Sequence, residues 1–319
     1  MHSVSASDPP AGPPRPVVQG AAEDRRLVPP NWLDQAPVTR GLLALNVGVF
    51  VLEVVLSRGL FLTTTTALQL GASYGLATVG EGRWETLVTA CFLHGSVLHL
   101  CFNMLALWQA GPLVERAVGS ARMAPMYLLA GAFGNLLSVG SAVLLHAGAQ
   151  GTYSVGASGA ISGVLAAALV LGWRVQGWRG PLTQAMARWL GFVVAFGLLS
   201  NMSGGSIDNA AHIGGAIAGG AIAAGWRRGY VYPEATTRAV LVGCVAAIVA
   251  CIAVLSVRES TSPFATMTVQ ERQQFTQDAV RDGRCRDAHD GLLAVERLKG
   301  RMDSLRKPVE MTCGHVLDR

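Results

Sequence analysis

Residues 157–173, ASGAISGVLAAALVLGW, form an uncharged stretch that is rich in glycine and alanine. Its length is close to the ~20 apolar residues with which a helix crosses a bilayer. Small side chains let helix backbones approach one another closely in lipid, so the stretch favours a helix inside a packed bundle. Its second residue is Ser158, which tight helix packing alone could explain.

The rest of the chain repeats this apolar character. The 319 residues are 51% hydrophobic and 14% charged, with a mean hydropathy of +0.39. Such values are typical of membrane proteins and rare in soluble domains. Seven apolar blocks can be marked, at about 41–57, 91–113, 123–145, 157–173, 186–200, 209–226 and 239–257. The sequence therefore predicts an all-α polytopic membrane protein with seven transmembrane helices.

Three segments outside these blocks differ in composition. Residues 1–37 carry eight of the fourteen prolines and no sustained apolar run, which predicts disorder and no signal peptide. Residues 58–90 are too polar to span and too apolar for a solvated loop, which predicts a structured, partly membrane-embedded loop. Residues 258–319 contain about half of the charged residues, which predicts a solvated, partly helical tail.

The arginines indicate the orientation in the membrane, because cytoplasmic connections carry the excess of Lys and Arg. With a cytoplasmic N-terminus, the outside connections between helices hold only Arg58 and Arg83. The inside segments then hold Arg15, Arg25, Arg26, Arg40, Arg116, Arg122, Arg174, Arg179, Arg188, Arg227, Arg228 and Arg238. Seven helices would place the tail outside. The net charge of +5 thus reflects topology and does not indicate nucleic-acid binding.

The six cysteines fall into two groups. Four lie in apolar blocks, where they are interpreted as small buried hydrophobic residues: Cys91, Cys101, Cys244 and Cys251. Cys285 and Cys313 lie in the tail, and in an oxidising compartment they could form a disulfide. The sequence leaves that pairing open, because it does not show their geometry.

Polar residues inside apolar blocks indicate functional positions, because burying them in lipid costs free energy. The second block contains His94, His99 and Asn103. On a helix His99 and Asn103 lie about 40° apart on one face, while His94 lies further round. The sixth block contains His212.

His212 shares its helix face with Gly215 and Gly219. These glycines leave room for a neighbouring helix, such as the one that starts near Ser158, to come close. In the seven-helix topology the second, fourth and sixth helices all begin at the outer face. His99, Asn103, Ser158 and His212 are therefore expected at similar depths in the outer half of the membrane.

This set of residues suffices for acyl transfer. His212 could take the proton of the Ser158 hydroxyl and later protonate the leaving amine. The side chains of His99 and Asn103 and the backbone N–H of Ser158 could stabilise the developing oxyanion. The N-terminal end of a helix, where Ser158 lies, also favours negative charge.

At this point the sequence resembles a known family, the rhomboid intramembrane serine proteases. The resemblance runs from about residue 70 to 220 through four motifs in the family's order. These are FLHGSVLHLCFNM (92–104), GPLVERAVGS (111–120), GASGAISG (156–163) and AHIGGAIAG (211–219). It implies a six-helix rhomboid-like core over 38–230, to which 231–257 adds a seventh transmembrane helix.

The resemblance also implies roles for individual residues. Ser158 would be the nucleophile and His212 the general base of a Ser-His dyad. His99, Asn103 and the Ser158 backbone N–H would bind the oxyanion. Supporting roles would fall to His94, Gly156, Gly159, Gly215 and Gly219. The pair Glu115 and Arg116 matches a structural loop motif that follows the second helix.

Two positions depart from the family pattern. Many relatives carry an aromatic residue four positions after the nucleophile, where this chain has Ser162. In the first loop the family often has Trp-Arg, where this chain has Trp84 and Glu85.

Two carboxylates receive no catalytic role: Asp208 is interpreted as a helix cap, and Glu53 is assigned no function.

The sequence thus predicts an intramembrane serine endopeptidase that cleaves other membrane proteins in or near their transmembrane segments. The alternatives are a catalytically silent rhomboid-like protein that binds and regulates transmembrane helices, and a small-solute or proton transporter. The expected partners are transmembrane substrates and the lipid bilayer; the oligomeric state is left open. No metal or organic cofactor is implied, since a serine mechanism needs none. A bacterial plasma membrane is the expected location, with the N-terminus cytoplasmic.

Overall fold

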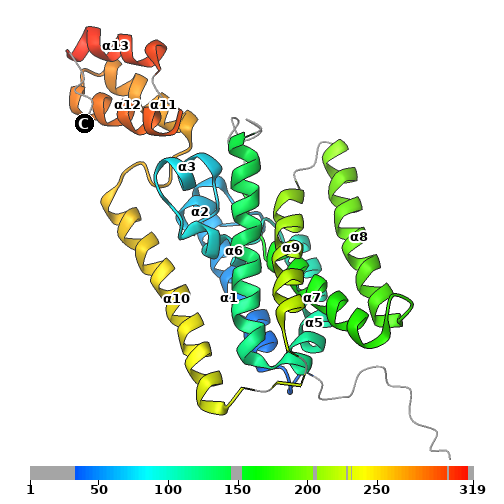
Figure 1. Cartoon of the computed structure of the whole chain (residues 1–319). Coiled ribbons are helices and arrows are strands. Elements are labelled where there is room, and N and C mark those ends of the chain that lie inside the picture. The colour runs from blue at the N-terminus through cyan, green and yellow to red at the C-terminus, as the bar shows by residue number, and fades with distance from the viewer. Residues whose placement is uncertain are drawn as a thin grey trace, which may run out of the picture.

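A computed structural model describes residues 33–144, 153–203, 207–227, 229–230, 232–299 and 302–314. Most of the predicted N-terminal segment, 1–37, lies outside the described residues. Within these described ranges, the bundle in Figure 1 consists of seven long helices: α1 (Pro37–Ser57), α5 (Val97–Val118), α6 (Ser120–Leu144), α7 (Ser158–Gln176), α8 (Pro181–Met202), α9 (Asn209–Gly225) and α10 (Glu234–Thr261). In that view α5, α7 and α9 run away from the bundle end that carries the tail, and the other four run toward it.

Six helices in the described part of the chain are long and apolar enough to cross a membrane. They are α1, α5, α6, α7, α8 and α10. The predicted all-helical, multi-pass membrane protein is therefore confirmed at this level. Helix α9 has 17 residues and is not among the six, so a bundle of seven crossings stays a prediction.

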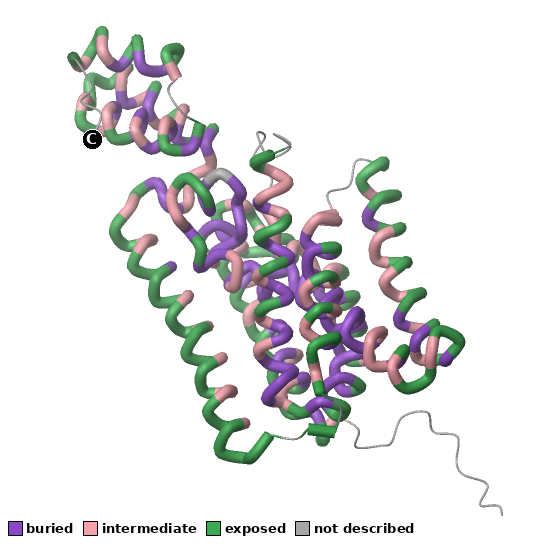
Figure 2. The backbone as a smooth tube through the Cα atoms, in the orientation of Figure 1, coloured by how far each residue is buried: buried purple, intermediate pink, exposed green. Residues whose placement is uncertain are grey.

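Apolar side chains cover the outside of the bundle. Figure 2 shows α10 mostly exposed and the buried residues gathered in α5, α6, α7 and α9. Of the described residues of α10 only Leu255 is buried, whereas Val242, Val245 and Val257 are at least 60% exposed. Such an exposed apolar helix surface is expected where lipid, and not water, surrounds the protein.

One predicted block, 91–113, is wrong at its start. Residues Ala90–Phe92 form a short 3-10 turn (η1), and α5 begins only at Val97. The Ser96 hydroxyl oxygen accepts a hydrogen bond from the His99 N–H (3.2 Å), which caps the helix at that point. His94 therefore lies in the turn before α5.

Glycines bring α6, α7 and α9 into backbone contact. A Cβ atom at Gly219 would lie 2.3 Å from the Gly163 carbonyl oxygen, and one at Gly134 would lie 2.6 Å from that of Ala211. Neither position accepts a larger residue without moving a helix. The close approach predicted for the glycine face of α9 is confirmed, and α7 is the partner.

The segment between α1 and α5 is structured, as predicted. It contains α2 (Thr64–Gln69), α3 (Gly75–Gly80) and α4 (Thr86–Thr89). The unusual Glu85 is 8% exposed, and its carboxylate lies 3.7 Å from Arg83 Nε and 3.4 Å from Arg258 Nε. Arg258 belongs to α10, so a helix outside the family motifs supplies a partner for Glu85.

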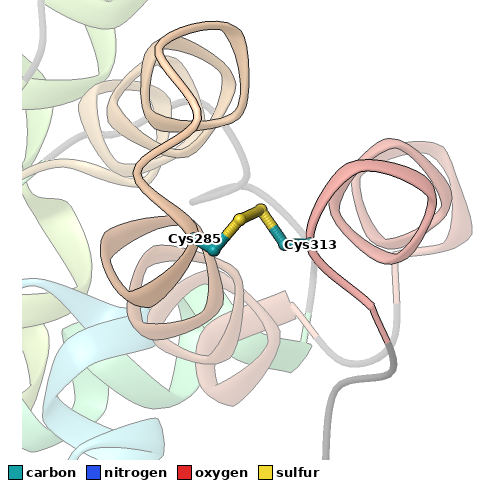
Figure 3. The surroundings of a disulfide bond; sticks show 2 residues. All are labelled: Cys285 and Cys313. Atoms are coloured by element: carbon teal, nitrogen blue, oxygen red, sulfur yellow. A yellow bond between two sulfur atoms is a disulfide. The ribbon is translucent and has the colours of Figure 1, made fainter.

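The tail forms a small helical unit on this segment. Its helices are α11 (Val269–Arg281), α12 (Cys285–Lys299) and α13 (Asp303–Cys313). A disulfide joins Cys285 to Cys313, with 5.1 Å between their Cα atoms (Figure 3). Figure 1 shows the unit next to α3, where Leu68 and Tyr74 share one apolar cluster with residues of the tail.

Candidate active site

Ser158 is the first residue of α7 and is presented by a short extended segment. The Ser154 and Ser73 backbones exchange hydrogen bonds of 2.7 and 3.0 Å, and the Gly156 N–H donates to the Ala90 carbonyl (2.9 Å). Gly156 has φ +137°, a conformation that L-amino acids with side chains rarely adopt. The loop before α5 thus holds the strand-like segment that leads to Ser158.

Ser158 and His212 are in hydrogen-bond contact. The Ser158 Oγ and His212 Nε2 atoms lie 2.8 Å apart, although 54 residues separate them in sequence. His212 is 8% exposed and lies in the first turn of α9. Its Nδ1 has no hydrogen-bond partner among the described residues, so within this part of the chain the pair has no third, carboxylate member.

Asp208 caps α9, as predicted. Its Oδ1 accepts from the Ala211 N–H (2.9 Å), and its Oδ2 accepts from the Ser138 hydroxyl of α6 (2.5 Å). Both carboxylate oxygens are thus used to fix the start of α9. The contact to Ser138 could not be found from sequence, since the two residues are 70 positions apart.

His99 points its ring toward the segment before Ser158. Its Nδ1 accepts a hydrogen bond from the Gly95 N–H (3.4 Å), which assigns the ring hydrogen of the neutral form to Nε2. A Cβ atom at Gly156 would lie 3.0 Å from His99 Nε2 and 3.4 Å from Ser158 Oγ. His99 Nε2 and Ser158 Oγ thus both border the space that a side chain at Gly156 would fill.

Asn103 lies one turn further along α5. It is 6% exposed, and its Nδ2 has no hydrogen-bond partner among the described residues. A buried amide donor without a partner is costly unless it serves a bound group. The backbone N–H of Ser158, in the first turn of α7, belongs to the amides that a helix leaves without an internal acceptor.

His94 is fully buried (0% exposed) in the turn before α5. Its ring packs edge-on against His99, with 5.3 Å between the ring centroids. Its backbone N–H donates to both carboxylate oxygens of Glu53, each at 3.1 Å. Sequence reasoning assigned Glu53 no role, although a carboxylate in an apolar helix is itself a signal of function.

The remaining predicted positions serve packing. A Cβ atom at Gly215 would lie 1.9 Å from the Gly159 carbonyl oxygen, and one at Gly159 would lie 3.3 Å from that of Ala211. Ser162 is 2% exposed inside α7. Among the described residues, no group of three or more His, Cys, Asp and Glu side chains could hold a metal ion.

Gly215→Ala is expected to disturb this site from a distance. The new methyl group would overlap the Gly159 carbonyl oxygen, so α9 would have to move away from α7. Overpacking of this kind costs about 1–3 kcal/mol of stability, and a displacement of about 1 Å costs ~100-fold in rate. Gly225→Ala is the matched control, because a Cβ atom there meets nothing within 4 Å. Equal activity of the two variants would contradict the prediction.

The fold and this geometry define a helical multi-pass membrane protein that brings a serine and a histidine into contact inside its bundle. The rhomboid domain model matches residues 81–229. Rhomboid protease AarA of Providencia stuartii is 31% identical over 201 residues, which cover 58% of this chain and 70% of AarA. The chain belongs to the rhomboid family.

Two further relatives show how far the similarity extends. Rhomboid protease GluP of Bacillus subtilis is 34% identical over 175 residues, which cover 53% of this chain and 31% of GluP. RHOMBOID-like protein 5 of Arabidopsis thaliana is 34% identical over 148 residues, 44% of this chain and 43% of that protein. The chain thus spans less than half the length of these two relatives.

Proposed function

We propose that this chain is a rhomboid-type serine endopeptidase that hydrolyses peptide bonds in or near the transmembrane segments of other membrane proteins. One observation carries the proposal: Ser158 Oγ and His212 Nε2 lie 2.8 Å apart. Relatives that are named rhomboid proteases support it. Ser158 is the proposed nucleophile, and His212 is its general base and acid.

In the proposed reaction the Ser158 oxygen attacks the carbonyl carbon of the scissile bond while its proton passes to His212 Nε2. His212 then gives that proton to the leaving amine, and an acyl-enzyme ester remains on Ser158. A water molecule, deprotonated by the same histidine, hydrolyses the ester and restores the free serine. These steps need no metal or organic cofactor.

The proposed oxyanion donors are the Nε2–H of His99, the Nδ2 amide of Asn103 and the backbone N–H of Ser158. The Asn103 amide, which has no hydrogen-bond partner in the part of the chain that the structure describes, supports this assignment. So does the hydrogen bond from Gly95 to His99 Nδ1, because it directs the ring hydrogen to the other nitrogen. The α7 dipole adds positive potential where the negative charge develops.

The proposed substrates are transmembrane helices that unwind locally, because a hydrogen-bonded helix hides its carbonyl groups from attack. Small or helix-destabilising residues are therefore expected at the cut. The proposed location is a bacterial plasma membrane, with the N-terminus in the cytoplasm and the tail outside. The Cys285–Cys313 disulfide supports an external tail.

A fluorescent activity-based serine probe tests the proposal on purified protein in liposomes. Wild type is expected to label, while Ser158→Ala and His212→Ala are expected to remain unlabelled. Equal labelling of wild type and Ser158→Ala would rule out Ser158 as the nucleophile. If no form labels and wild type also fails to cleave a model transmembrane substrate, a non-cleaving protein that binds transmembrane helices becomes the better explanation.

A further inference from the structure

Glu53 is a buried carboxylate in the last turns of α1 (Pro37–Ser57). The buried residues of α1 are Thr39, Leu42, Asn46, Phe50 and Glu53, which form one face turned to the bundle. Glu53 is 1% exposed, whereas its neighbour Leu52 is 46% exposed. A buried carboxyl group in an apolar helix costs free energy, so its position calls for a specific partner.

That partner is the backbone of the turn before α5. Both oxygens of Glu53 accept from the His94 N–H, at 3.1 Å each. Residues 93–96 are not helical. The Leu93 N–H donates to the Ala90 carbonyl (3.3 Å), whereas the His94 and Gly95 amides need acceptors from elsewhere. Glu53 supplies the acceptor for one of them from a helix 41 residues away in sequence.

The next amide in the chain links this turn to His99. While the His94 N–H donates to Glu53, the adjacent Gly95 N–H donates to His99 Nδ1 (3.4 Å). The His94 ring also packs against the His99 ring. Two consecutive amides therefore connect the carboxylate of α1 to the imidazole whose Nε2 borders Gly156, two residues before Ser158.

We propose that Glu53 is a positioning residue for the oxyanion donor His99: it holds the His94–Gly95 backbone so that His99 keeps its ring hydrogen on Nε2, toward Ser158. This inference rests on the proposed function. Glu53 touches neither substrate nor the reacting atoms. Glu53 acts through the turn at residues 93–96. A substitution of Glu53 should therefore lower kcat only when His99 is present.

The first test compares kcat for a model transmembrane substrate in liposomes. Glu53→Leu is expected to lower kcat by about 10- to 100-fold with KM little changed, less than the ~100- to 1,000-fold typical for removal of an oxyanion donor. Glu53→Gln keeps one oxygen for the His94 N–H and is expected to stay within about fivefold of wild type. Asn46→Leu removes a polar group from the same face of α1, where the Asn46 amide donates to the Leu42 carbonyl of its own helix, and is expected to leave kcat unchanged.

The second test asks whether Glu53 acts through His99. In a His99→Ala background, Glu53→Leu is expected to lower kcat by less than about threefold, because residues that act as a unit are not additive. A loss as large as in the wild-type background would overturn the proposal. If Glu53→Leu does not fold, Glu53→Asp, whose shorter side chain withdraws the oxygens from His94, replaces it in both backgrounds.

The third test does not depend on activity. With ¹⁵N-labelled histidine, the His99 signal, assigned by its loss in His99→Ala, is expected to report the Nε2–H tautomer in wild type and Glu53→Gln. A mixture of tautomers is expected in Glu53→Leu. An unchanged tautomer in Glu53→Leu would overturn the inference. If wild type cleaves nothing, the proposed function fails, and this measurement alone decides whether Glu53 orients His99.

Discussion

His212→Ala is expected to lower kcat for a transmembrane substrate by about 10⁴-fold or more, with KM changed only slightly. Ser158 Oγ lies 2.8 Å from His212 Nε2, the proposed proton acceptor, and without a base the hydroxyl is a weak nucleophile. Removal of the base from a serine protease costs losses on the order of 10⁴- to 10⁶-fold. Steady-state cleavage in liposomes measures both constants.

The double variant Ser158→Ala with His212→Ala provides the control. Because the two side chains act as one unit, the double variant should be no slower than either single variant. The proposed oxyanion donors would remain in all three proteins and set the same residual rate. A loss of less than tenfold in His212→Ala would assign the proton transfer to a different group.

Arg272→Ala is expected to have the largest effect on the tail. Arg272 is 1% exposed, and its guanidinium group forms an ion pair with Glu81 of the loop before α5. It also donates to the carbonyl oxygens of Phe264 (2.7 Å), Met267 (3.1 Å) and Ala294 (3.2 Å). Its removal would leave the Glu81 carboxylate without this ion-pair partner and would take one donor from each of the three carbonyls, a loss of about 3–5 kcal/mol for a buried pair.

Hydrogen exchange measures this effect where it arises. The amides of α11 and α12 are expected to exchange faster in Arg272→Ala by a factor that corresponds to the lost free energy. Arg281→Ala is the matched control on the same helix, because the Arg281 side chain is 73% exposed and pairs with Asp278 at the surface. Such surface pairs contribute about 0–1 kcal/mol. Equal protection of α11 in the two variants would refute the role of Arg272.

Features that depend on local sequence could be predicted before the structure. The apolar blocks and their lengths identified the long helices, because hydropathy and helix length act within one segment. The predicted block begins six residues before α5, since the apolar residues 91–93 look the same in a helix and in a buried turn. Ser96 as a cap was the available signal.

The residues of the candidate active site can be predicted from the sequence, whereas the distances between them cannot. Ser158, His99, Asn103 and His212 stand out in sequence because polar residues are rare in apolar helices. The 2.8 Å contact of Ser158 and His212 depends on how closely α7 and α9 approach. The glycines of α9 predict a close approach to α7, but only packing specifies the distance and register of the two helices.

The amino-acid sequence by itself determined that the chain is a helical membrane protein and which side chains could perform acyl transfer. Only the tertiary structure decided which groups meet across long stretches of chain: Glu53 with the His94 amide, Glu85 with Arg258, and Arg272 with Glu81. The physical reason is that hydropathy and helix periodicity are local properties. The partner of a buried charge depends on which segments the fold brings together, and its free energy depends on that contact.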